Sequence, residues 1–128
     1  MIFGTHILFY STKPDADRAF FHKVLKFRSV DAGNGWLIFA MPPAEAAFHP
    51  SDGEFSQAHA DHRMMGAVIY LMCDNLSALI KSLKKKKVKC TEVATERWGI
   101  RTSIKLPSGA ELGLYQPTHP MAIRRRKK

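Results

Sequence analysis

The stretch THILFYS at residues 5–11 has a counterpart in AVIYLMC at residues 67–73, and each opens the same series of patterns. Both stretches are rich in β-branched and aromatic residues, and both lead into a helical pattern followed by strand-like stretches. The chain therefore reads as one unit that occurs twice, with corresponding points about 62 to 66 residues apart. The later counterparts are GWLIFAM (35–41) with WGIRTSI (98–104), and PAEAAFHP (43–50) with GAELGLYQP (109–117).

Each half is predicted to run strand, helix, strand, strand, strand, an order that favours an α+β fold with mixed sheets. Asp15 or a neighbour begins the first helix, which continues to about Leu25, and Asp74 or Asn75 caps the second, which the lysines at 84–87 end. The predicted strands are 4–11, 28–31, 36–41 and 45–49 in the first half, and 67–72, 88–93, 98–106 and 111–115 in the second. Polar residues 51–65 are interpreted as the loop that joins the halves, and 94–97 as a turn.

These patterns predict two tandem βαβββ modules, at about 4–50 and 66–117, that pack together around a cleft. Neither module is large enough to bury a core alone, so residues 1–120 are expected to form a single domain. Residues 121–128 follow Pro120 and form a basic tail outside that domain.

Composition is that of a folded protein that neither spans a membrane nor carries a secretion signal. The chain has 128 residues, 45% of them hydrophobic, and no apolar run approaches the length of a membrane span. The N-terminus lacks the basic and apolar segments of a secretory signal, so a cytoplasmic location is expected. Cys73 and Cys90 form no CxxC motif and are interpreted as reduced, partly buried thiols.

The net charge of +9 is confined to two short segments. Residues 124–128 are all Arg or Lys, residues 84–87 are all Lys, and together they account for the whole excess. A nucleic-acid-binding face usually spreads its cations along a helix or sheet that follows the phosphates. Lysines at the end of a helix instead complement the helix dipole. No specific nucleic-acid partner is therefore expected.

The repeated βαβββ order resembles the vicinal oxygen chelate superfamily, which includes glyoxalase I, extradiol dioxygenases and bleomycin-resistance proteins. The resemblance covers roughly residues 4 to 117. Its most telling local pieces are YLMCDN at 70–75 and LPSGAELGLYQP at 106–117. It implies two curved sheets around a cleft and, in metal-using members, one ligand from the first and last strand of each module.

Carried over by position, the four ligand places of the resemblance are His6, Ala47, Val68 and Gly113. Only the histidine can coordinate a metal, and a divalent ion needs three or four good ligands. No metal or other cofactor is therefore expected. A divalent metal remains the alternative, held by a displaced set formed by His6, His49 and Glu111.

Glu111 is the candidate catalytic acid or base, because its face of the last strand is expected to look into the cleft. The alternative is an edge carboxylate paired with Lys105 or Arg101. Glu45 is its repeat mate in the first half. The residues expected to line the ligand-binding cleft are His6, His49, Trp98, Arg101 and Glu111.

Two further groups of residues complete the candidates. Trp36 and Trp98 occupy matching points of the repeat and are expected in the core or the cleft wall, where an aromatic side chain can stack on a planar ligand. Arg101 is placed to meet a carboxylate or phosphate. The cluster of His59, Asp61 and His62 lacks the context of a zinc site and is interpreted as part of a solvated loop.

Three functions follow in order of preference. The first is binding of a small organic molecule in the cleft without chemistry, as in bleomycin-resistance-type proteins. The alternative is a metal-dependent lyase, isomerase or dioxygenase of the glyoxalase type that uses the displaced ligand set. The third is a protein or RNA adaptor that acts through the basic tail. Exposed sheet edges also favour a symmetric homodimer.

Overall fold

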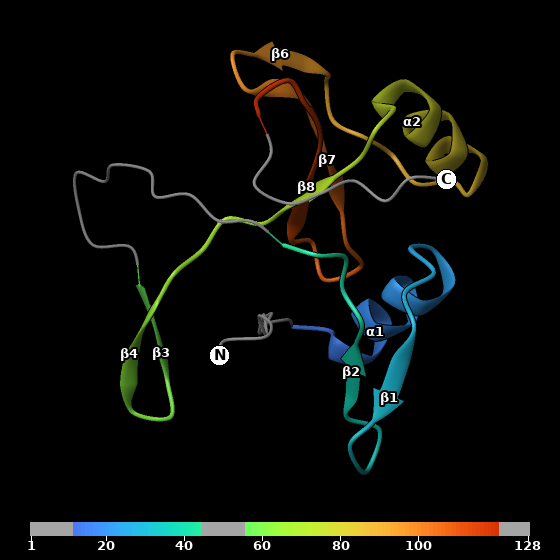
Figure 1. Cartoon of the computed structure of the whole chain (residues 1–128). Helices are drawn as coiled ribbons and strands as arrows, with labels where there is room; N and C mark the ends of the chain where they lie inside the picture. The colour runs from blue at the N-terminus through green and yellow to red at the C-terminus, as the bar shows by residue number, and fades with distance from the viewer. Residues whose placement is uncertain (1–11, 45–55, 121–128) are drawn as a thin grey trace.

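The structure, a computed structural model, describes residues 12–44 and 56–120. The strands expected at 4–11 and 45–49 and the basic tail lie outside the described residues. Figure 1 shows the arrangement of the elements, which follow one another in this order: α1 (Pro14–Lys23), β1 (Ser29–Asp31), β2 (Leu37–Phe39), β3 (Ser56–His59), β4 (His62–Met65), β5 (Tyr70–Met72), α2 (Leu76–Lys85), β6 (Ala94–Glu96), β7 (Gly99–Lys105) and β8 (Glu111–Pro117).

The second half of the chain forms a four-stranded mixed sheet with the order β5-β8-β7-β6. Strand β5 lies parallel to β8, and the other two pairs are antiparallel. Helix α2 connects β5 to β6, so this half has the predicted order of strand, helix and three strands. The described part of the first half contains α1 and the antiparallel pair β1–β2, and the α+β class is confirmed.

Helix α2 begins where its free backbone N–H groups find side-chain acceptors. The side-chain oxygen of Asn75 accepts from the N–H of Ala78 at 3.0 Å, and the side-chain oxygen of Gln116 accepts from the N–H of Leu76 at 2.9 Å. The second bond joins the start of the helix to β8. Leu76 and Leu83, two turns apart, are buried and hold the helix against the sheet.

The hydrophobic core lies between the sheet and the helices and joins the two halves. Ile104, Leu112 and Leu114 form it from β7 and β8, and Phe21 of α1 belongs to the same buried cluster. Polar contacts reinforce this junction at two points. The N–H of Ser108, in the β7–β8 turn, donates to the Asp17 carboxylate at 3.2 Å, and the Lys86 ammonium donates at 3.1 Å to the backbone carbonyl of Val24, the residue that follows α1.

The prediction of a loop over 51–65 was wrong for residues 56–65, which form the β3–β4 hairpin. The pair His59 and His62 closes a two-residue turn at Ala60 and Asp61, and both turn residues have positive φ angles, 52° and 62°. A two-residue turn of this kind matches the twist of a hairpin. All side chains described between 56 and 64 are exposed. The strands therefore lack the alternation of apolar and polar residues by which a strand is predicted.

Two predictions in the second half were also wrong. The strand expected at 88–93 is reduced to an isolated bridge between Cys90 and Ile104, and the turn expected at 94–97 is largely strand β6. Thr91 explains the break. Its hydroxyl accepts from the N–H of Ser103 at 2.8 Å, the donor that a continuing backbone ladder needs. In the first half, helix α1 ends at Lys23, within two residues of the predicted end at about Leu25.

Cys73 and Cys90 are free thiols and partly buried, as expected. Burial raises the pKa of the Cys73 thiol, and the neighbouring Asp74 carboxylate raises it further against a lowering backbone hydrogen bond from Asn75. Burial also raises the pKa of the Cys90 thiol. Both therefore hold less reactive thiolate near neutral pH than an exposed cysteine does. Neither described helix is long and apolar enough to cross a membrane.

The capping of α2 yields the first prediction. Replacing Asn75 by Ala removes the acceptor for the Ala78 N–H and should lower the free energy of unfolding by about 1 kcal/mol, measured by urea denaturation. The matched control Asn75→Asp keeps a side-chain acceptor at the same place and should retain most of the stability. Equal stability of the Ala and Asp variants would contradict the assignment.

Candidate ligand-binding cavity

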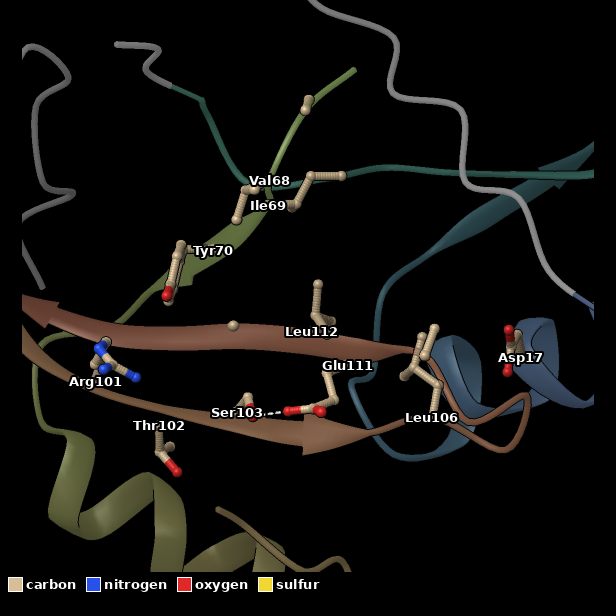
Figure 2. A pocket seen from close by; sticks show the side chains of 13 residues that line it. Asp17, Val68, Ile69, Tyr70, Arg101, Thr102, Ser103, Leu106, Glu111 and Leu112 are labelled. Atoms are coloured by element: carbon tan, nitrogen blue, oxygen red, sulfur yellow. Dashed lines mark hydrogen bonds between the residues drawn. The ribbon is translucent and has the colours of Figure 1, made fainter. Parts of the chain in front are cut away.

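A cavity of about 440 Å³ lies on the face of the four-stranded sheet that is turned away from α2 (Figure 2). Its volume is within the usual range of small-molecule sites, roughly 300 to 1,000 Å³. It takes residues from β7, β8 and the turn between them, from β5 and the segment before it, and one from α1. Its described lining consists of Asp17, Ala67, Val68, Ile69, Tyr70, Arg101, Thr102, Ser103, Leu106, Ala110, Glu111, Leu112 and Gly113.

The strand register explains why polar residues reach the cavity. Along β7, Thr102 and Ile104 are almost fully buried toward the core, so Arg101 and Ser103 project to the opposite face. In the register with β8, Ser103 stands opposite Gly113, and Lys105 stands opposite Glu111. The alternation of the two strands thus places an arginine, a serine and a glutamate on one surface.

Arg101 is held by a carboxylate on the neighbouring strand. Its Nε donates to Oε2 of Glu96 on β6 at 2.6 Å, and both side chains are about one-third exposed. This hydrogen bond raises the pKa of Arg101, so the guanidinium is charged at every physiological pH. Because the bond uses Nε, it leaves the two terminal nitrogens of the guanidinium for a further acceptor. The alternative that paired Arg101 with Glu111 was therefore wrong.

Ser103 and Glu111 form a directed hydrogen-bond chain with Thr91. The Ser103 hydroxyl donates to Oε1 of Glu111 at 2.7 Å, and the Thr91 hydroxyl lies 2.9 Å from Ser103 Oγ. A serine has a single hydroxyl proton, which is given to the carboxylate, so Thr91 is the donor in the second bond. The chain fixes the orientation of Glu111 and leaves lone pairs of its carboxylate for a further donor.

Aromatic side chains form one end of the cavity and support it from behind. The rings of Tyr70, Trp98 and Tyr115 meet edge to face, with centroids 5.3 to 5.5 Å apart. The Tyr115 hydroxyl lies 3.0 Å from Nε2 of His119, and the His119 ring stacks on the Tyr115 ring. Tyr70 lines the cavity, whereas Trp98 packs behind it and is not part of the described lining.

The ring of Tyr70 lies directly against Gly113. A Cβ atom at position 113 would overlap with three carbon atoms of the Tyr70 ring, so this position has no room for a side chain. Two of the four ligand positions implied by the resemblance lie within the described residues. Val68 belongs to the first strand of the second module, and Gly113 belongs to its last strand. Neither carries a donor, and at one of them an aromatic ring fills the space. These residues do not fit a metal ion.

The structure tests some of the candidate residues and not others. Arg101 and Glu111 both line the cavity, and Trp98 lies beside it. His6 and His49, with Glu45 and Ala47, are outside the described residues. Within residues 12–44 and 56–120, no group of three His, Cys, Asp or Glu side chains is placed to hold a metal.

The first-half tryptophan does not share the position of its repeat mate. Trp36 is 52% exposed, and the guanidinium of Arg18 lies over its ring at 5.3 Å. Its prediction as a core or cleft-wall residue was wrong, because it lies at a turn beside the short β1–β2 pair. His59 and His62 are exposed on the β3–β4 hairpin, as expected of a solvated segment, but the segment is strand rather than loop.

Sequence reasoning missed most of the lining residues, and three of them, Tyr70, Ser103 and Asp17, matter for the site. Tyr70 and Ser103 carried a usable signal, because each stands two residues from a position already singled out, Val68 and Arg101, on an alternating strand. Asp17 carried none. It comes from α1 in the other half and reaches the cavity only because the β7–β8 turn packs against that helix.

No family model and no curated protein matches the sequence. Solved structures do match. An antibiotic-binding protein from Streptomyces sp. CB03234, TnmS3, has a TM-score of 0.62 at 19% identity, covering 92% of this chain and 99% of that one. A lactoylglutathione lyase from Agrobacterium tumefaciens has a TM-score of 0.57 at 16% identity, covering 91% of this chain and 92% of that one. A glyoxalase/bleomycin resistance protein/dioxygenase superfamily member from Sphaerobacter thermophilus has a TM-score of 0.56 at 18% identity, covering 91% of this chain and 98% of that one.

These similarities show that the chain has the vicinal oxygen chelate fold. They extend over about nine-tenths of the chain and nearly the whole of each of these three structures, so the resemblance to that fold is confirmed. Identities below 20% carry the fold and not the activity.

The contact between Tyr70 and Gly113 can be tested by a double-mutant cycle. Gly113→Ala should cost about 1 to 3 kcal/mol of stability by urea denaturation, because the new methyl group overlaps the Tyr70 ring. In a Tyr70→Ala background the same change should cost much less. A cost that is equal in both backgrounds would show that the glycine is required by the strand and not by the ring.

Proposed function

We propose that this protein binds a small organic molecule in the cavity above β7 and β8, without a metal ion, as a member of the glyoxalase/bleomycin-resistance type. The observation that carries the proposal is the Tyr70 ring, which fills the space at Gly113 and forms a wall of the cavity. An aromatic wall with a few convergent polar groups is typical of a binding site for an organic ligand.

The comparisons support this proposal at the level of fold. TnmS3, with the same fold, is an antibiotic-binding protein, so the fold serves ligand binding in at least that case. The lactoylglutathione lyase shows that the fold also supports catalysis. For this chain the alternative is therefore a metal-dependent lyase, isomerase or dioxygenase, which requires His6, His49 and Glu111 to hold the ion.

A thermal-shift screen of small organic molecules, run with and without divalent metals, separates the two functions. Ligands of the native state should raise the melting temperature equally under both conditions, because the proposed site uses no metal. Purified protein should contain much less than one equivalent of Zn, Ni, Fe or Mn by metal analysis. Stoichiometric metal that His6→Ala removes would contradict the proposal and support the enzyme.

The location of the site can be checked with any molecule found in that screen. Tyr70→Ala should weaken its binding by about tenfold or more in calorimetric titration, because the aromatic wall is lost. The matched control is Trp36→Ala, which removes an exposed aromatic side chain from the other half and should leave the affinity unchanged. Equal effects of the two substitutions would place the ligand elsewhere.

We further propose a symmetric homodimer in the cytoplasm. The support is structural for the dimer and compositional for the location. Within the described residues, β5 and β6 are the outer strands of their sheet, and the exposed β3–β4 hairpin pairs only with itself; such edges favour association. Free thiols suit a reducing compartment. Light scattering should report twice the monomer mass at micromolar concentration, and a monomer there would contradict this proposal.

We propose no specific nucleic-acid partner. One lysine of the 84–87 cluster already has a structural role, since the Lys86 ammonium donates to the carbonyl of Val24 and ties α2 to α1. The cluster lies in the last turn of α2 and just beyond it, where cations complement the helix dipole. Binding of polyanions by this surface should therefore be weak and should disappear at physiological salt.

A further inference from the structure

The charged groups of the cavity are separated along its length. Figure 2 shows the Arg101 guanidinium at one end, beneath Tyr70, the Glu111 carboxylate further along, beside Ser103, and the Asp17 carboxylate beyond it. The register gives the scale. Glu111 pairs with Lys105, four residues beyond Arg101 on β7, and four residues of antiparallel strand span about 14 Å.

The two ends are complementary to opposite charges. At the first end Arg101 offers its terminal N–H groups, because Glu96 engages only Nε. At the second end Ser103 donates to one oxygen of Glu111, and a carboxylate accepts several hydrogen bonds. Among the described lining residues Arg101 is the only cation, and the exposed Lys105 is not part of the lining. The acidic end therefore suits a cationic group of the ligand.

Between the two ends the lining is mostly apolar. Figure 2 shows Val68 and Ile69 above the strands, with the Tyr70 ring next to Arg101. A hydrocarbon or aromatic segment buries these surfaces without leaving a polar group unpaired. The Ser103 hydroxyl is the polar group in the middle of the cavity, and it is already bonded to Glu111.

We propose that the ligand is an elongated zwitterion, with an anionic group that binds Arg101, a protonated amine that binds Glu111, and an apolar segment against Tyr70 and Val68. This assignment rests on the proposed function and names its ligand class. The ends of an extended tripeptide are about 10 Å apart, which fits between groups attached about 14 Å apart. Tripeptide-sized molecules with free termini therefore have the required chemistry.

Matched tripeptides test the proposal on the full chain. Alanyl-phenylalanyl-alanine with free termini is titrated by calorimetry beside its N-acetylated form, which lacks the amine charge, and its C-amidated form, which lacks the carboxylate. Each modification should weaken binding by about tenfold or more, because a charge-assisted hydrogen bond is lost. Equal affinity of the three peptides would overturn the proposal.

Protein variants then assign each end of the ligand. In Glu111→Gln the free and N-acetylated peptides should bind alike, while amidation still weakens binding. In Arg101→Gln the free and C-amidated peptides should bind alike, while N-acetylation should still weaken binding. Asp15→Asn, a carboxylate on the exposed face of α1, is the matched control and should behave as the unaltered protein. Unchanged melting temperatures show that the variants are folded, and Arg101→Lys, which keeps the charge, should restore part of the discrimination.

The outcomes separate this proposal from the function on which it rests. A neutral aromatic molecule that binds through Tyr70 and is indifferent to Glu111→Gln and Arg101→Gln would leave the binding function standing and overturn the zwitterion. A loss of discrimination at the wrong end in either variant would also overturn it. The absence of any bound organic molecule, in the screen and in the peptide titrations, would overturn both.

Discussion

The antiparallel register between β7 and β8 is the constraint on which the rest of the structure depends. It sends Ile104, Leu112 and Leu114 into the core and turns Arg101 and Glu111 to the cavity. A shift of one residue would exchange the two faces, burying the charges and exposing the aliphatic residues. The cost of that exchange holds the register in place. The hydrophobic core and the cavity thus lie on the two faces of one strand pair.

The same pairing decides which side chains surround the cavity. Because Gly113 stands on the cavity face of β8 and β5 lies next to it, the Tyr70 ring packs across the glycine. An aromatic wall now stands at a place where a metal-using protein of this fold would carry a ligand. The remaining polar groups are held by their neighbours, Arg101 by Glu96 and Glu111 by Ser103. Such preorganised groups favour recognition of a ligand by shape and charge.

Much of this architecture was predictable because it depends on local sequence patterns. The alternating residues of β7 and β8, the Asn75 cap and the heptad spacing of Leu76 and Leu83 each report on a neighbourhood of a few residues. The β3–β4 hairpin was not predictable, because its exposed side chains carry no apolar periodicity. The break in pairing at Thr91 was equally hidden, since it depends on a hydroxyl meeting an N–H on another strand.

The sequence by itself determined the repeated βαβββ order, the absence of donors at three of the four ligand places, and two residues of the cavity, Arg101 and Glu111. Only the tertiary structure decided which side chains contact one another. Asp17 joins the cavity from the other half, and Arg101 pairs with Glu96 rather than Glu111. Periodicity specifies which face of a strand a side chain occupies. Its partners across the sheet depend on strand order and on the packing of distant elements, which local pattern does not encode.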